Sequence, residues 1–169
     1  MYTTRRRRLP DETLHARRPV QPASAGHLSM KIRQFDFAAD YERVVKLWET
    51  IEIGMRVGPS DAPDEIKKKL ERDPDLFLVA ENKNEIVGSI IGAFDGRRGM
   101  IYHLAVRSDF RRRGIGQALL TEVEKRLKAK GCIKCLLIVT DDNDGAKHFY
   151  HERGWNLLPD DRVFSKMFV

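Results

Sequence analysis

The amino-acid sequence predicts an α/β fold with a mixed central sheet of about seven strands. The first observation is the order of the expected elements, which alternates as βααβββαβαββ. The second is a set of three consecutive strand patterns separated by short polar turns, which is typical of hairpins. The third is an amphipathic helix followed by the largely apolar strand 133–139, as expected at the centre of a sheet. Together they indicate a sheet that is mixed rather than purely parallel.

The first half of this domain begins at Met30, where residues 30–35 alternate as an edge strand does. Asp40 is the expected N-cap of a helix that carries apolar residues on one face as far as Ile51. After a loop, Pro63 opens a second helix, which ends before Pro74. The three strands that follow are 76–80, 86–94 and 100–106.

The second half begins with a helix that opens at the arginine-glycine stretch 111–116 and ends near Gly131, a natural C-cap residue. Its apolar positions have helical spacing, and they are Ile115, Leu119, Leu120, Val123 and Leu127. After strand 133–139, a short helix is expected over 143–153. Residues 155–158 and 162–168 are the expected closing strands.

The charge of the chain is concentrated at its N-terminus. The 169 residues carry a formal net charge of +6, and residues 1–29 hold six of the arginines against Asp11 and Glu12. Because the remainder is nearly neutral, nucleic acid is not the expected partner of the folded domain. We expect 1–29 to be a disordered basic extension and 30–169 to be the functional domain. A basic arm that binds RNA, DNA or anionic lipid is the alternative for 1–29, and a transit peptide is a more distant one, because Asp11 and Glu12 do not suit it.

Composition excludes several other classes of protein. No run approaches the roughly 18 apolar residues of a membrane helix, so no membrane partner is expected. Two cysteines are too few for a disulfide-stapled domain and indicate a reducing, cytoplasmic location. Cys132 and Cys135 lack a second cysteine pair, and three residues apart in an extended strand they would face opposite sides. No metal is therefore expected.

The most informative stretch is the loop 111–116 at the start of the third helix. A helix N-terminus offers unpaired N–H groups and partial positive charge to an anion. Gly114 and Gly116 leave room for a phosphate to approach the backbone, and three arginines add charge. The stretch lacks the Walker A pattern, and Leu119 stands where a dinucleotide fingerprint needs Gly or Ala. A diphosphate of another kind is the expected ligand.

Two motifs together resemble the GNAT superfamily of acyl-coenzyme A N-acyltransferases. Arg111-x-x-Gly114-x-Gly116, preceded by Leu104-Ala105-Val106, resembles its motif A. Asn143-x-x-Ala146-x-x-Phe149-Tyr150-x-x-x-Gly154-Trp155 resembles its second signature. The resemblance covers 30–169 and is strongest to the small bacterial YpeA-type branch, near the ribosomal-protein alanine acetyltransferases. It implies a mostly antiparallel sheet with helices on both faces, splayed between the fourth and fifth strands.

The resemblance also implies a set of residues that bind acetyl-CoA, the expected co-substrate. Backbone groups of the fourth strand would pair with the pantetheine arm, an amide near Leu104 would face the thioester carbonyl, and Asn143 would orient the cofactor. The amides of 112–117 would lie over the diphosphate, with Arg111 and Arg112 as its main charge partners. The full set is Leu104, Ala105, Val106, Arg111, Arg112, Arg113, Gly114, Ile115, Gly116, Gln117 and Asn143.

Tyr150 is the expected catalytic residue. In this superfamily the equivalent tyrosine gives a proton to the departing thiolate, and a phenol is neutral at pH 7 and can donate. Packing of its ring on an amphipathic helix is the alternative role. Helix capping is likewise an alternative or additional role for Asn143.

The general base is where the sequence departs from the family. Ile138 and Tyr102 stand where many members carry a glutamate. The candidates that remain are Tyr102, His103, Glu52 and Asp141. Deprotonating a lysine at pH 7 costs about 4.6 kcal/mol, whereas an α-amine costs about 1.2 kcal/mol. We therefore expect a primary amine acceptor, with an α-amine of a small molecule or protein N-terminus preferred over lysine.

Acceptor contacts are expected from the two early helices and the loop between them. The residues considered are Trp48, Glu52, Arg56, Asp61 and Asp64. The expected reaction is direct acetyl transfer in a ternary complex, and a homodimer is the expected assembly by family resemblance. A catalytically weak acyl-CoA-binding module is the alternative function, favoured by the missing carboxylates and opposed by Tyr150.

Overall fold

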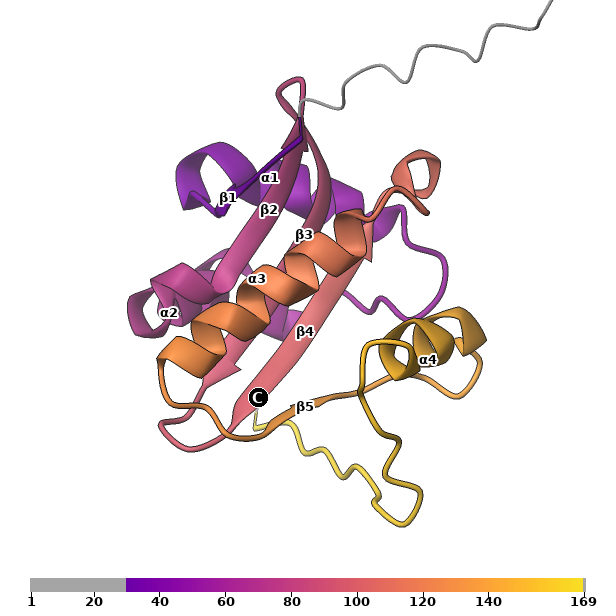
Figure 1. The fold of residues 1–169 in the computed structure, drawn as a ribbon. Helices are drawn as coiled ribbons and strands as arrows, with labels where there is room; N and C mark the ends of the chain where they lie inside the picture. The colour runs from indigo at the N-terminus through magenta and orange to yellow at the C-terminus, as the bar shows by residue number, and fades with distance from the viewer. Residues whose placement is uncertain (1–29, 169) are drawn as a thin grey trace, which may run out of the picture.

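A five-stranded mixed sheet, in the order β1-β2-β3-β4-β5, forms the centre of the computed structural model, which describes residues 30–168 (Figure 1). Strands β1 to β4 pair antiparallel, and β5 pairs parallel to β4. The strands are β1 (Met30–Gln34), β2 (Phe77–Asn82), β3 (Glu85–Phe94), β4 (Gly99–Val106) and β5 (Cys135–Leu137). The helices are α1 (Phe37–Glu49), α2 (Pro63–Arg72), α3 (Ile115–Ala129) and α4 (Asp144–His151).

Helices cover both faces of the sheet, because β2 buries side chains on both sides. Leu78 and Ala80 point into a core completed by α3, whereas Phe77 and Val79 point into a second core completed by α1 and α2. Figure 1 shows α3 on one side of the sheet and α1 on the other. All five apolar positions predicted for α3 are buried. The predicted mixed α/β class and two-sided arrangement are confirmed.

Several helix and strand boundaries lie where local sequence signals predict them. Lys83 and Asn84 both have positive φ, as the tight turn between β2 and β3 requires. Pro63 stands at the first position of α2, and the helix ends at Arg72, before Pro74. Gly131, with φ of +85°, follows the C-cap of α3, and its N–H bonds the carbonyl of Lys128.

The first helix begins earlier than predicted. Asp36, not Asp40, is the N-cap of α1, and its carboxylate accepts a hydrogen bond of 2.9 Å from the amide of Ala39. Asp40 lies in the first turn with its side chain fully buried, where it binds the guanidinium of Arg33 on β1. Either aspartate is a residue type that suits an N-cap. Asp40 instead pairs with Arg33 on β1, and Asp36 caps the helix.

The prediction of seven strands is wrong for the described part of the chain, which forms five. Residues 155–158 and 162–168 adopt no strand, and 133–139 contributes only the three residues of β5. Phe164 and Phe168 are 93% and 90% exposed. Alternating apolar residues favour a strand only where a neighbouring edge accepts their backbone hydrogen bonds, and no described segment pairs with these residues.

The predicted extension, 1–29, lies outside the described residues. No helix within 30–168 is long and apolar enough to cross a bilayer.

Candidate active site

The loop that opens α3 has the backbone shape of an anion site. Arg112 and the N-cap residue Gly114 have φ of +58° and +80°, and this part of the loop is exposed. The first bond of the helix runs from the amide of Ala118 to the carbonyl of Gly114, at 2.9 Å. The amides of 115–117 therefore precede the first helical donor, the amide of Ala118, and are available to an anion.

The three arginines of this loop differ in their contacts. The Arg111 side chain turns back to β4, where its Nε donates a hydrogen bond of 3.2 Å to the carbonyl of Val106. The guanidinium of Arg113 lies 4.9 Å from the ring centre of Phe110. Arg112 has no ion pair with any residue of 30–168. All three side chains are exposed and carry positive charge beside the free amides.

Strand β4 ends next to this loop, without a neighbour on one side. It pairs with β5 only from Gly99 to Ile101. Beyond that point Ala105 and Val106 still pair with β3, whereas the opposite edge of 102–106 faces no described strand. The separation of the fourth and fifth strands implied by the family resemblance is therefore present. It leaves backbone groups on this edge of Leu104 to Val106 for a ligand, except the Val106 carbonyl, which accepts the hydrogen bond from Arg111.

Tyr150, on α4, sits in an aromatic cluster. Its ring meets Phe149 edge-on at 5.2 Å between centroids and Trp155 at 5.9 Å. Burial raises the pKa of Tyr150 to about 12. The phenol therefore keeps its proton at neutral pH and is available as a hydrogen-bond donor or acid.

Asn143 caps α4. Its Oδ1 accepts a hydrogen bond of 3.0 Å from the amide of Ala146. Its Nδ2 lies close to Gly54 in the loop between α1 and α2, where a Cβ built on that glycine would be 2.6 Å away. The capping role is thus observed, and the role in orienting a cofactor stays a prediction.

Side-chain contacts join the two motifs. A Cβ built on Gly116 would lie 3.5 Å from the ring of Phe149, so α4 rests against the start of α3. Arg153 donates to the carbonyl of Phe149 at 2.6 Å and to Oε1 of Gln117 at 3.4 Å. Trp155 Nε1 donates to Glu124 on α3 at 2.9 Å. Arg153 and Glu124 were not predicted as links, because Arg153 stands at an open position of the second motif and Glu124 lies outside both motifs.

The residues considered as bases or acceptor contacts fall into two groups. Glu52, Arg56, Asp64 and Asp141 are exposed. Trp48 and Asp61 are buried, at 1% and 6% exposure. Asp61 instead contacts His103, whose Nε2 lies 2.7 Å from its Oδ1. Burial raises the pKa of Tyr102, which makes its phenolate less available as a base.

Cys132 and Cys135 do not face opposite sides as predicted. Cys132 precedes β5, so strand alternation does not apply to the pair. Both sulfur atoms lie 3.0 Å from where a Cβ of Gly99 would stand. Within 30–168, no three histidine, cysteine or acidic side chains form a group able to hold a metal ion.

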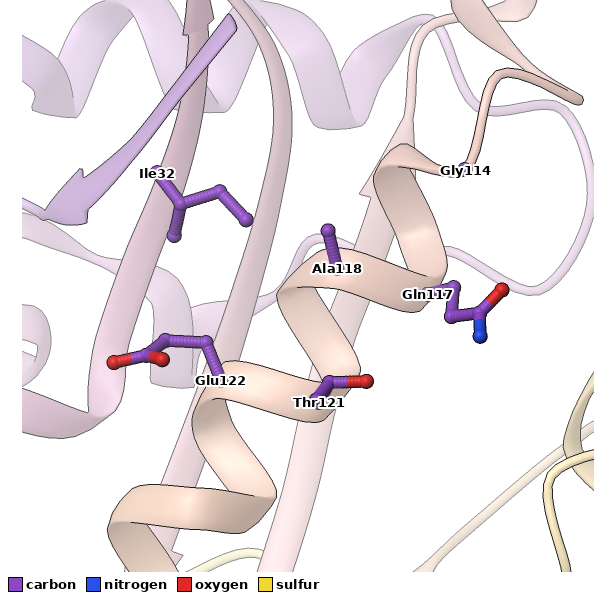
Figure 2. A pocket seen from close by; sticks show the side chains of 6 residues that line it. All are labelled: Ile32, Gly114, Gln117, Ala118, Thr121 and Glu122. Carbon is purple, nitrogen blue, oxygen red and sulfur yellow. The ribbon is translucent and has the colours of Figure 1, made fainter.

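Two cavities border the junction of loop, β4 and α4, but neither is lined by Tyr150 or by Leu104 to Val106. A cavity of about 620 Å³ runs along α3 toward β1 and shares Gly114 and Gln117 with the anion loop (Figure 2). Its only charged lining residue, Glu122, binds Arg126 at 2.8 Å. The other, about 510 Å³, lies between α3, β5 and the segment that follows α4. Because the expected proton donor, Tyr150, lines neither cavity, we place the chemistry at the junction.

Comparison with known proteins identifies the family that the two motifs resemble. The family model described as acetyltransferase (GNAT) family matches residues 41–155. A curated acetyltransferase from Pectobacterium atrosepticum is 47% identical over 124 residues, which cover 73% of this chain and 85% of that protein.

Solved structures agree in fold. Ard1 from Thermoplasma volcanium is 25% identical with a TM-score of 0.68, covering 78% of this chain and 85% of that one. The PaiA N-acetyltransferase from Thermoplasma acidophilum, solved in complex with coenzyme A, is 20% identical with a TM-score of 0.67, covering 79% of this chain and 94% of that one.

The match to the family model spans more than half of the chain, the curated relative carries the name of the activity, and the junction supplies an anion loop beside a free strand edge. The chain belongs to the GNAT family and is an acyltransferase.

Proposed function

We propose that this protein transfers an acetyl group from acetyl-CoA to a primary amine, by direct transfer in a ternary complex. One observation carries the proposal: the anion loop of α3 adjoins the unpaired edge of β4, and α4, which carries the protonated Tyr150, packs against the start of α3 through Phe149. Each supplies a different requirement of the reaction, namely charge for a diphosphate, backbone groups for an amide-bearing arm, and a proton donor.

The residues present fit the co-substrate. The free amides of Ile115 to Gln117 and the exposed side chains of Arg111 and Arg112 suit a diphosphate. Gly114 and Gly116 have no side chain that would block the approach of the diphosphate to the backbone, and Arg113 adds positive charge. The edge of Leu104 to Val106 suits the amides of a pantetheine arm, and Asn143 stays in the proposed binding set. Acetyl-CoA supplies the activated acetyl group, and no metal is part of the proposal.

Tyr150 is the proposed acid. As the amine attacks the carbonyl carbon, the sulfur leaves as a thiolate and takes the phenolic proton. The high pKa of Tyr150, raised by burial, keeps that proton in place until the thiolate develops. An amide near Leu104 is proposed to polarise the carbonyl. Proximity in the ternary complex supplies the rest, because residues 30–168 offer no activated nucleophile for a covalent intermediate beside the loop.

The proposed acceptor is an α-amine, of a small molecule or of a protein N-terminus, in preference to lysine. Ile138 and Tyr102, which are 59% and 45% exposed, stand at the two positions where many family members carry a glutamate. Neither side chain is a strong base at neutral pH. A site of this kind favours the amine that is cheaper to deprotonate. We further propose a cytoplasmic homodimer; the exposed apolar side chains of 157–168 support an assembly, and the two free cysteines support a reducing location.

The test uses two peptides of matched composition. One has a free α-amine and no lysine; the other has a blocked N-terminus and one lysine. We expect acetyl-CoA-dependent acetylation, followed by mass spectrometry, to be at least tenfold faster on the first. Faster acetylation of the lysine peptide would contradict the acceptor preference.

The second candidate is a module that binds acyl-CoA without turning it over, and the missing carboxylates favour it. Binding of acetyl-CoA with no release of free CoA across a panel of amines would establish that reading. Nucleic-acid binding through 1–29 is a third and weaker candidate. It predicts binding that depends strongly on salt and disappears when the chain begins at Met30.

A further inference from the structure

His103 occupies an irregular point of β4. The pairing of β3 with β4 shifts register between Ser89 and Ile91, so that His103 and Leu104 together oppose Ile90. His103 has φ of +49°, which a β-strand residue other than glycine adopts only when its surroundings impose it. Such a bulge redirects a side chain out of the strand's regular alternation.

Side chains of helix α1 and strand β3 hold His103 in place. Its ring lies 4.5 Å from that of Trp48, between centroids. The indole Nε1 of Trp48 donates to Oγ of Ser89 at 2.9 Å, and that hydroxyl donates to the carbonyl of His103 at 3.4 Å. Helix α1 and strand β3 therefore both fix the bulge, its backbone as well as its ring.

Asp61 fixes the tautomer of the ring. Its Oδ1 lies 2.7 Å from Nε2 of His103, and its Oδ2 accepts a hydrogen bond of 2.9 Å from the amide of Gly58. An ionised carboxylate only accepts hydrogen bonds, so Nε2 must carry the hydrogen. Nδ1 then holds a lone pair in the neutral ring. Nδ1 has no hydrogen-bond partner within 30–168, and it is not among the fully buried atoms there that lack one.

The position of this pair matches the place where an acceptor must enter. His103 lies two residues beyond Ile101, the last residue of β4 that pairs with β5. The loop between α1 and α2 carries Asp61 to His103 at one end and Gly54 to Asn143 at the other. The loop therefore reaches both His103 on β4 and Asn143 at the start of α4, and this places the His103–Asp61 pair on the side of β4 that the loop covers.

The other bases considered from sequence lack this arrangement. Glu52 and Asp141 are exposed and accept no side-chain hydrogen bond from residues 30–168 that would fix them. The raised pKa of Tyr102 disfavours its basic form. Of the four candidates, His103 is the one whose acceptor atom is oriented by a second, buried side chain.

We propose that His103 accepts the proton of the acceptor amine through Nδ1, and that Asp61 is its positioning residue. This inference rests on the proposed function and names its base. As the amine nitrogen bonds to the acetyl carbon and the carbon–sulfur bond breaks, the proton lost by nitrogen moves to His103. The sulfur takes the proton of Tyr150. His103 then releases its proton to water and Tyr150 regains one, so the protein is unchanged after a cycle.

His103→Asn in the full-length chain tests the proposal. Asparagine tolerates positive φ, and its amide can donate to Asp61, but it has no basic nitrogen. We expect kcat for the free-α-amine peptide to fall at least 100-fold, while the thermal stabilisation by acetyl-CoA is unchanged. The matched control is His148→Asn, since His148 is an exposed residue of α4 with a 74% exposed side chain. This variant should keep wild-type kcat.

His103→Gly separates a chemical role from a structural one. Glycine also suits the positive φ, and it leaves space beside Trp48. Added imidazole should restore at least tenfold in kcat, and a less basic imidazole of similar shape should restore less. Asp61→Asn should lower kcat more than it raises KM.

Three outcomes would overturn the proposal. One is a His103→Asn enzyme within threefold of wild type, and another is rescue that does not depend on the basicity of the added imidazole. The third is loss of acetyl-CoA stabilisation in the variant, which would make His103 structural. A wild-type enzyme that binds acetyl-CoA but acetylates neither peptide contradicts the proposed function itself, which distinguishes the two failures.

Discussion

At the scale of single residues, the proposed reaction depends most on the hydroxyl of Tyr150. Because burial raises its pKa to about 12, the phenol stays protonated throughout the range in which an α-amine is nucleophilic. Replacing it with phenylalanine keeps the aromatic packing against Phe149 and Trp155 and removes only the donor. The variant therefore isolates the proton transfer from the fold.

We predict that Tyr150→Phe lowers kcat by about 100-fold or more, because positioned general acids contribute roughly that much. Binding of acetyl-CoA, measured by calorimetry, should stay within about threefold of wild type. An enzyme that keeps full turnover would remove Tyr150 from the chemistry and leave it the packing role of its ring.

Single residues also show where sequence reasoning reached its limit. The two motifs identified from sequence do come together in the fold, since Gly116 and Phe149 meet. The pairing of His103 with Asp61 joins residues 42 positions apart, and the bulge that permits it depends on the register of β3 against β4. No local pattern carries that register, so sequence reasoning gave both residues without their contact.

At the scale of elements, the shape of the loop before α3 depends on Gly114. Its φ of +80° lies in the left-handed region, and a Cβ there would meet no atom within 4 Å. Any penalty of a substitution therefore comes from the backbone and not from a clash. Gly96, in the turn between β3 and β4, has φ of +97° and equally open surroundings, so it is a matched control.

We predict that Gly114→Ala and Gly96→Ala each destabilise the fold by about 1 kcal/mol, measured by urea unfolding. Only Gly114→Ala should also weaken acetyl-CoA binding, by tenfold or more, because the loop amides lose their alignment. Equal acetyl-CoA affinity in the two variants would show that the loop does not bind the diphosphate.

A buried ion pair joins β1 to α1. The Asp40 side chain is fully buried and its carboxylate accepts a hydrogen bond of 2.9 Å from Arg33. Burial raises the pKa of Asp40, but the bonds from Arg33 and from the amide of Asp36 outweigh it and hold the pKa below its usual 3.8. The folded state thus favours the ionised form.

We predict that Asp40→Ala destabilises the fold by about 3 kcal/mol, because it leaves Arg33 half-buried with one partner fewer. The exposed Asp64→Ala should change stability by less than about 0.5 kcal/mol. The contribution of Asp40 should be complete above pH 3.8 and decline as the pH falls through the lowered pKa of the folded state. Urea unfolding at several pH values measures both effects, and equal losses in the two variants would contradict the assigned role.

At the scale of the whole molecule, prediction from sequence succeeded where a pattern is satisfied locally. The apolar face of α3 and the turn at Lys83 and Asn84 are examples, because helix periodicity and positive φ are properties of a few adjacent residues. It failed for 155–158 and 162–168. Those segments have strand-like composition, but a strand also needs an edge to pair with, and β5 offers only three residues.

The central claim is that acetyl-CoA binds at the junction of the α3 loop, β4 and α4. Thermal unfolding of the full chain with acetyl-CoA tests it most directly. A ligand at 100 times its Kd stabilises a fold by about 2.7 kcal/mol. For a domain of this size, that corresponds to a rise in Tm of about 5–10 °C. We predict such a rise, of equal size in a chain that begins at Met30, and one of about half that size or less in Gly114→Ala, because tenfold weaker binding reduces the stabilisation to about 1.4 kcal/mol. No rise in wild-type Tm at saturating acetyl-CoA would contradict the account.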